Sequence, residues 1–229
     1  MNSIIHTPTN NLAESLEFYT KLGFVRLPNT GLELVSDGRA VIEINPDRYA
    51  RAGVKLLSES WEKIVDDLED LASVLRLENG YLLSDPSGVW IYLIETQEEM
   101  SLDISAFSSS VLGNYAGISL ETTSINNSYH LWKLLGFNQV EGDIEQGWIT
   151  LKNYDGLVVS LMKPLTCPHL FFNPSLTYFN GNKNMEIIEK IRSLQIPITE
   201  EITHFNKEGV VDNIIIRDPG GYAFFLFND

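Results

Sequence analysis

The chain has 229 residues, 44% of them hydrophobic, and its 31 Asp and Glu against 16 Lys and Arg give a formal net charge of -15. This composition is ordinary for a globular protein, and the absence of any basic run argues against a nucleic-acid partner, which needs clustered Lys and Arg. No segment approaches 18 continuous apolar residues and Cys167 is the only cysteine, so we expect no membrane partner, no internal disulfide and a cytoplasmic location.

Residues 1–46 predict one βαβββ module. An apolar segment at 3–7 is typical of a strand, and Asn11 begins a pattern that resembles a capping box. Apolar residues then recur at helical spacing until Gly23 ends the helix. Three short strands are expected to follow, at 24–27, 32–35 and 41–44.

Residues 50–95 predict a second module of the same kind. A strand at 54–57 precedes a helix whose apolar face runs from Trp61 to Leu68. Further strands are expected at 74–77, 80–83 and 89–94. The segment at 98–113 is polar and then serine-rich, which is typical of a linker.

Two sequence signatures each occur twice, and they alternate along the chain. SLEFYTKLGF at 15–24 is echoed by SYHLWKLLGF at 128–137, and DPSGVWIYL at 85–93 is echoed by DPGGYAFFL at 218–226. Self-similarity of this kind indicates repeated structural units. The order therefore predicts four modules arranged as two tandem pairs.

The second pair of modules covers 115–164 and 174–229. We therefore predict an α+β fold of four βαβββ modules paired into two domains, at 1–97 and 114–229, with a linker at 98–113. The prediction rests on the repeat and on the strand and helix periodicities, because neither signature is specific alone.

These paired signatures resemble the vicinal oxygen chelate superfamily, which includes glyoxalase I, bleomycin-resistance proteins and extradiol dioxygenases. The resemblance covers essentially the whole chain. It implies curved mixed sheets with helices on the convex side and a small organic molecule as partner on the concave side. Enzymes of the superfamily hold a divalent metal there with His or Glu from the first and last strands of each module, and the metal polarises two neighbouring substrate oxygens.

Few of the matching positions in this chain hold a metal ligand. An ungapped count places Ile4 at the first position and His6 two residues on, on the same side of the strand, while Glu43 takes the place of a carboxylate. The remaining positions hold Val54, Tyr92, Gly117, Ser160 or Leu161, Leu176 and Phe225. We therefore expect no cofactor, with a divalent metal bound by His6 and Glu43 as the alternative.

The resemblance and the aromatic residues of the last strands favour a ligand site in the first domain. We expect His6, Glu43, Trp90 and Tyr92 to line it, and the second domain to be more occluded and mainly structural. The predicted function is metal-free binding or sequestration of a small molecule by a monomer or homodimer. The alternative is a metal-dependent lyase or dioxygenase that uses His6 and Glu43. Other readings stay open: His6 as a buried, hydrogen-bonded histidine, Glu43 as a solvated carboxylate, and the aromatics as core.

Overall fold

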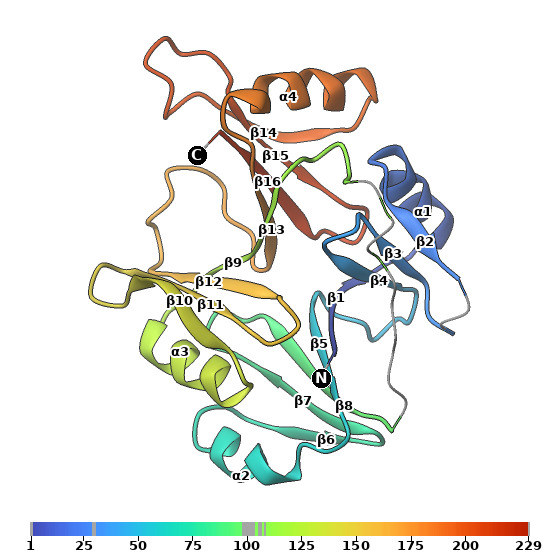
Figure 1. Cartoon of the computed structure of the whole chain (residues 1–229), viewed down its shortest axis with the longest axis vertical. Coiled ribbons are helices and arrows are strands. Elements are labelled where there is room, and N and C mark those ends of the chain that lie inside the picture. Colours follow the sequence, from blue (N-terminus) through green and yellow to red (C-terminus); the bar gives the residue numbers. More distant parts are fainter. Residues whose placement is uncertain (1, 29–30, 98–103, 105–106, 108, 229) are drawn as a thin grey trace.

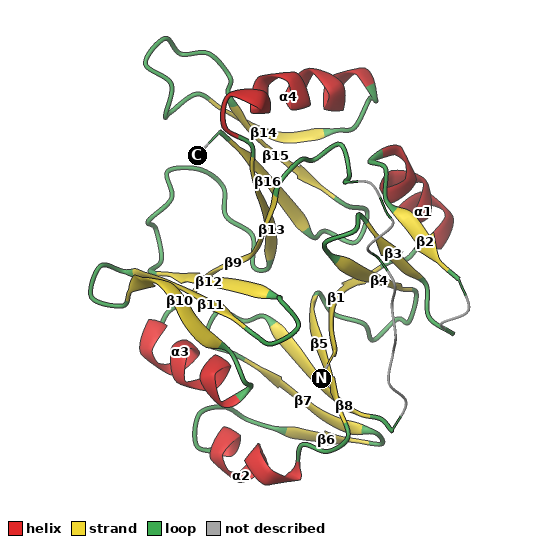
Figure 2. Ribbon diagram, in the orientation of Figure 1, coloured by secondary structure: helices red, strands yellow, loops and turns green. Residues whose placement is uncertain are grey.

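The computed structural model describes residues 2–28, 31–97, 104, 107 and 109–228. Within these residues the chain forms two eight-stranded sheets, four α-helices and one short 3-10 helix (Figures 1 and 2). Both sheets are mixed, and the α+β class is confirmed. The described part of the chain contains no helix long and apolar enough to cross a membrane.

The first sheet contains the strands of the first two modules. In spatial order they are β2 (Val25–Leu27), β3 (Leu34–Ser36), β4 (Val41–Asn45), β1 (Asn2–Pro8), β5 (Gly53–Ser58), β8 (Trp90–Glu95), β7 (Gly80–Ser84) and β6 (Leu75–Leu77). The helices are α1 (Leu12–Lys21) and α2 (Glu62–Glu69).

The second sheet repeats this order. Its strands are β10 (Asn138–Asp143), β11 (Trp148–Lys152), β12 (Val158–Met162), β9 (Tyr115–Glu121), β13 (Ser175–Phe179), β16 (Ala223–Phe227), β15 (Asn213–Arg217) and β14 (Ile198–Ile202). The helices are α3 (Ile125–Leu134), η1 (Gly181–Lys183) and α4 (Asn184–Ser193).

Each sheet joins two βαβββ modules through their first strands. β1 pairs antiparallel with β5, while each of these strands pairs parallel with the last strand of its own module, β4 or β8. β9 and β13 do the same with β12 and β16. The four-module prediction is therefore confirmed. The exact domain limits stay a proposal, because 98–103, 105–106 and 108 of the predicted linker lie outside the described residues.

The repeated helix signature has the same local structure in both halves. The hydroxyls of Thr9 and Ser15 lie 2.7 Å apart before and within α1, and those of Thr122 and Ser128 lie 2.7 Å apart at α3. This buried pair explains why both signatures begin with Ser. The signature's glycine then ends each helix at a φ of +88°, a conformation that residues with a Cβ rarely adopt.

The hydrophobic core is continuous between the two sheets. It contains Ile5 and Leu56 of the first sheet together with Ile118 and Leu161 of the second. The helices also pack across the halves, since α2 contacts α3, and α1 lies beside the last strands of the chain (Figure 1). On the other, concave face of each sheet, the described residues that pack against the strands include none from a helix, and this face carries the candidate site residues.

Candidate functional site

Four strands place one polar or aromatic residue each at the centre of the first concave face. In the sheet register His6 of β1 lies beside Glu43 of β4, and Lys55 of β5 lies beside Tyr92 of β8. Side chains alternate along a strand, so Trp90 projects from the same face of β8 as Tyr92. We call these five residues the first face.

His6 is a buried, hydrogen-bonded histidine. Its Nδ1 lies 2.8 Å from the carbonyl oxygen of Arg51, and because a carbonyl only accepts, Nδ1 carries the hydrogen. Its Nε2 then accepts from the Asn45 side-chain amide at 3.0 Å. Burial, with a smaller effect from Lys55, lowers the pKa of His6 below its ordinary value, so the ring is neutral at pH 7.

Glu43 and Lys55 form a buried ion pair next to His6. The Lys55 ammonium lies 2.8 Å from Oε1 and 2.6 Å from Oε2 of Glu43, and the two side chains are 15% and 3% exposed respectively. Asn45 also donates to Glu43 Oε1 at 3.3 Å. Glu43 is thus not a solvated strand carboxylate. Its charge is balanced by Lys55, which the sequence analysis did not include among the site residues.

The aromatic residues of β8 flank this polar cluster. The Tyr92 ring lies edge-on to His6, with 4.8 Å between ring centroids, and its hydroxyl accepts from the Arg51 backbone N–H at 3.1 Å. Burial raises the pKa of Tyr92, which keeps the phenol neutral. Trp90 is 37% exposed. Of the four predicted residues, His6, Glu43 and Tyr92 therefore belong to one cluster of contacting side chains. Trp90 has exposed aromatic surface on the same face.

Lys55 was not predicted as a site residue because the expected ligand position on β5 was one residue too early. The sequence analysis placed Val54 at this position, but Val54 is fully buried in the core on the helix side. A shift of one residue along a strand moves a side chain to the opposite face. The apolar neighbours Val54 and Leu56 on either side of a lone Lys were the signal that could have identified the correct register.

The second concave face holds hydroxyl and aromatic side chains at the matching places. By the strand register, Ser119, Ser160, Thr177 and Phe225 take the positions of His6, Glu43, Lys55 and Tyr92 respectively. The Ser119 and Thr177 hydroxyls lie 2.7 Å apart. The position expected at Leu176 was wrong for the same reason as Val54, because Leu176 belongs to the core and Thr177 is on the concave side. Gly117 lies on the concave side, two residues before Ser119 and beside Thr177.

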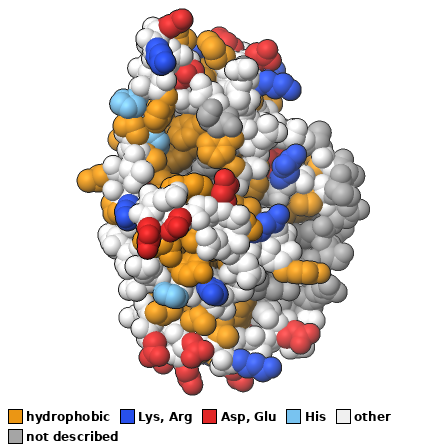
Figure 3. All heavy atoms as spheres, turned by 60° about the vertical axis from the view of Figure 1, so that its left-hand side comes forward, with side chains coloured by type: hydrophobic (Ala, Val, Ile, Leu, Met, Phe, Trp, Pro, Cys, Tyr) orange, Lys and Arg blue, Asp and Glu red, His pale blue; other side chains and the backbone are white. Residues whose placement is uncertain are grey.

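A loop covers part of the second face, where Phe225 is 1% exposed and packs against Phe171 and Phe172. The loop before β13 brings His169 within 5.3 Å of Phe225 and 5.1 Å of Phe227, between ring centroids. Phe179 and Phe205 nearby are 42% and 53% exposed. Figure 3 shows hydrophobic side chains gathered in patches on this side of the molecule.

Comparison with known proteins shows which solved structures share this fold. No family model and no curated protein sequence matches the chain. Among solved structures, the 2,3-dioxygenase LapB from Pseudomonas sp. KL28 matches with a TM-score of 0.54 and 18% identity, over 97% of this chain and 89% of that one. The chain has the fold of the vicinal oxygen chelate superfamily.

Two further structures of this superfamily agree. A variant of 4-hydroxymandelate synthase from Streptomyces coelicolor matches with a TM-score of 0.53 and 14% identity, over 97% of this chain and 90% of that one. A variant of homoprotocatechuate 2,3-dioxygenase from Brevibacterium fuscum matches with a TM-score of 0.54 and 15% identity, over 99% and 70%. At these identities the comparisons establish the fold, and the activity is a separate question.

The comparison corrects one prediction from the sequence. We expected no cofactor, but two of these structural neighbours are extradiol dioxygenases, which are metal-dependent enzymes. The prediction of a protein without a cofactor is contradicted by this finding and is withdrawn.

The arrangement of the first-face residues does not fit a metal site. Both carboxylate oxygens of Glu43 face the Lys55 ammonium, and His6 Nε2 accepts from Asn45. A metal ion bound by Glu43 would have to displace the Lys55 ammonium, and a metal ion bound by His6 would have to displace the Asn45 amide. Within the described residues, moreover, no group of three or more His, Cys, Asp or Glu side chains could hold a metal ion.

Proposed function

We propose that this chain binds a small organic molecule on its first concave face. The observation that supports the proposal is a buried polar cluster next to partly exposed aromatic surface. His6, Glu43 and Lys55 supply hydrogen-bonding and charged groups, while Trp90 and Tyr92 supply the apolar part. A few convergent polar groups in an apolar surround are typical of small-molecule sites.

Each residue of the first face would have a distinct role in binding the ligand. Trp90, the most exposed member, stacks on the flat part of the ligand. The Lys55 ammonium has three donors, and the ones not directed at Glu43 are available to a ligand oxygen. Tyr92 and His6 hold the wall of the site in place through their edge-on contact and through Arg51.

The alternative of a lyase or dioxygenase that uses His6 and Glu43 gains no support from the geometry. Both residues already have partners, and these partners would have to leave before either residue could ligate a metal. Uptake of one equivalent of Fe, Mn, Ni or Zn that is lost in Glu43→Ala would favour the enzyme.

A fragment screen by ligand-observed NMR tests the binding site. Trp90→Ala is expected to weaken first-face hits by about 1–3 kcal/mol, the scale of one lost aromatic contact. Trp148→Ala is the matched control, because Trp148 is 38% exposed against 37% for Trp90 and projects from the concave face of the second sheet. Hits that are insensitive to Trp90→Ala would contradict the proposal.

The aromatic cluster around His169 supports a second candidate site for the same kind of ligand. His169 Nδ1 lies 2.7 Å from the Leu170 carbonyl oxygen, so Nδ1 carries the hydrogen and Nε2 is an acceptor among phenyl rings. If the second face is the binding site, the fragment hits are lost in Phe179→Ala and kept in Trp90→Ala. The same screen therefore distinguishes the two faces.

A further inference from the structure

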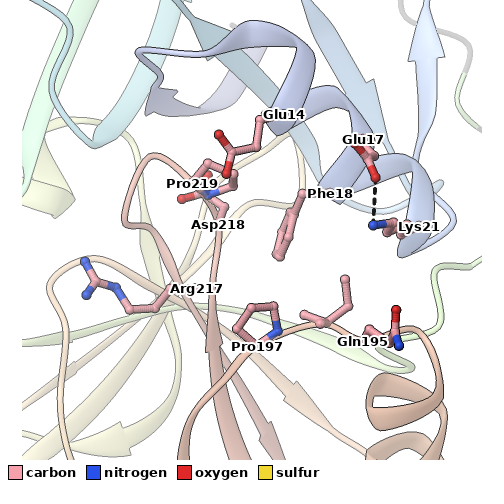
Figure 4. Close-up of a pocket in the computed structure, with 10 residues that line it drawn as sticks. Glu14, Glu17, Phe18, Lys21, Gln195, Pro197, Arg217, Asp218 and Pro219 are labelled. Atoms are coloured by element: carbon pink, nitrogen blue, oxygen red, sulfur yellow. Dashed lines mark ion pairs between the residues drawn. The ribbon is translucent and has the colours of Figure 1, made fainter.

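A cavity of about 400 Å³ lies away from both concave faces, at the junction of the two halves. One wall is α1 of the first module, and the other is formed by the segments that follow α4 and β15 in the last module (Figure 4). Its size is within the range of small-molecule sites. The cavity is lined by Glu14, Glu17, Phe18, Lys21, Gln195, Ile196, Pro197, Arg217, Asp218 and Pro219.

The middle of the cavity is apolar. Figure 4 shows the Phe18 ring pointing from α1 into the space above Pro197, with Pro219 at one end. Phe18 and Ile196 are 8% and 6% exposed, so most of each side chain is packed in the protein and the remaining surface forms the bottom of the cavity. These walls suit a flat apolar group placed between the helix and the Pro197 segment.

Among the charged side chains that line this cavity, the Glu14 carboxylate has no cationic partner within the described residues. Glu17 pairs with Lys21 at 2.7 Å, and the Arg217 side chain turns away from Phe18 (Figure 4), so that its guanidinium lies 4.7 Å from the Phe172 ring. Glu14 is exposed, forms no ion pair among the described residues, and accepts only from the neutral Asn11 amide at 3.2 Å.

Asp218 does not compete for this role. It is 4% exposed, and its Oδ2 accepts from the hydroxyls of Thr7 and Tyr19 at 2.7 and 2.9 Å. Its hydrogen bonds hold α1 against the last module and so shape the cavity. The charge that a ligand meets at the open side is therefore the Glu14 carboxylate.

We propose that this cavity binds an organic ammonium ion with a flat apolar body. The body lies between Phe18 and Pro197, and the ammonium donates to the Glu14 carboxylate, a charge-assisted hydrogen bond. Because the walls come from both halves of the chain, such a ligand also stabilises their docking, and the folded protein gains stability by mass action. The site is independent of the function proposed for the first face.

Titration with benzylammonium chloride, followed by two-dimensional NMR of the whole chain, tests the proposal. We expect saturable shifts at the amides of Phe18, Gln195 and Ile196, and none at Trp90. Benzyl alcohol and phenylacetate carry the same ring with a neutral or a negative group, and we expect both to bind at least five-fold more weakly.

The matched variants are Glu14→Gln and Glu186→Gln. Both glutamates are exposed and lie in the first turn of a helix, but Glu186 is on α4 and does not line the cavity. Glu14→Gln is expected to weaken benzylammonium binding about five-fold, the scale of about 1 kcal/mol for an exposed ion pair. Equal affinity for benzyl alcohol, an unchanged affinity in Glu14→Gln, or shifts confined to other surfaces would each overturn the proposal.

Discussion

The hydroxyl of Tyr19 donates a hydrogen bond to Asp218 at 2.9 Å, although the two residues lie 199 positions apart. Tyr19 belongs to the repeated helix signature of the first half, and Asp218 to the repeated turn signature of the second. The mirror contact joins Trp132 of α3 to Asp85, with 3.0 Å between the indole nitrogen and the carboxylate. Each half thus places its helix aromatic on the turn of the other, which explains why the two signatures recur together.

This contact predicts a cost for removing the Tyr19 hydroxyl. Tyr19→Phe leaves buried Asp218 with one donor fewer, and we expect the free energy of unfolding to fall by about 1–3 kcal/mol. Urea unfolding followed by tryptophan fluorescence measures this. Tyr49→Phe is the matched control, because Tyr49 is 71% exposed and should change stability little. Equal stability of the two variants would contradict the prediction.

The two turn carboxylates also predict a pH dependence. Burial raises the pKa of both Asp218 and Asp85 above the ordinary Asp value, against the opposing effect of their hydrogen bonds. A carboxyl with a raised pKa binds its proton more tightly in the folded chain. Its contribution to stability is therefore complete below the unfolded pKa and is lost as the pH rises through the folded pKa.

Asp218→Asn tests this sign. As the pH is lowered from about 7 to about 4, the wild type should gain free energy of unfolding relative to Asp218→Asn, which cannot take up that proton. Urea unfolding at closely spaced pH values measures the difference. A difference that stays constant would show that hydrogen bonding cancels the effect of burial at Asp218, and a difference that moves the other way would show that it outweighs burial.

A buried hydroxyl without a partner predicts a stabilising substitution. Tyr222 is 1% exposed, and its hydroxyl has no hydrogen-bond partner within the described residues. Tyr222→Phe removes this desolvated group, and we expect a gain of about 1 kcal/mol. The hydroxyl of equally buried Tyr178 lies 3.4 Å from Asp37, so Tyr178→Phe should instead lose stability. Thermal unfolding of the pair, with Tm shifts of opposite sign, is the expected result.

The fold could be predicted from the sequence because its determinants are local. Ser15 and the left-handed Gly23 lie within the helix signature, Thr9 lies only six residues before Ser15, and all three recur in the second half. The contact of α1 with the last module could not be predicted in this way. Phe18 and Phe224, whose ring centroids lie 5.9 Å apart, come from modules that no local pattern links.

The site could be predicted only in part. His6, Glu43, Trp90 and Tyr92 share one face because strand alternation is regular. The alternation of Val54, Lys55 and Leu56 marks Lys55 as facing away from the core, but its position beside Tyr92 depends on long-range strand pairing. The aromatic cluster of the second face forms because an irregular loop places His169 beside Phe227. The sequence of an irregular loop has no periodic pattern from which this position could be predicted. The predicted monomer or homodimer and the cytoplasmic location stay predictions.

The Glu43–Lys55 pair predicts a large effect from a single substitution on the first face. Lys55→Met leaves the Glu43 carboxylate buried at 3% exposure without a counter-ion, and we expect a loss of about 3–5 kcal/mol. Chemical unfolding measures this. Lys21→Met is the matched control on α1, because Lys21 and Glu17 are 44% and 65% exposed and such pairs contribute about 0–1 kcal/mol.

The double variant decides whether this loss comes from the buried charge. Lys55→Met combined with Glu43→Gln removes both charges and leaves an amide in place of the carboxylate, so most of the loss should be recovered. Asn45 can still donate to the new amide oxygen, as it does to Glu43 Oε1. If the double variant were as unstable as Lys55→Met alone, the packing of the lysine stem rather than the ion pair would hold this face together.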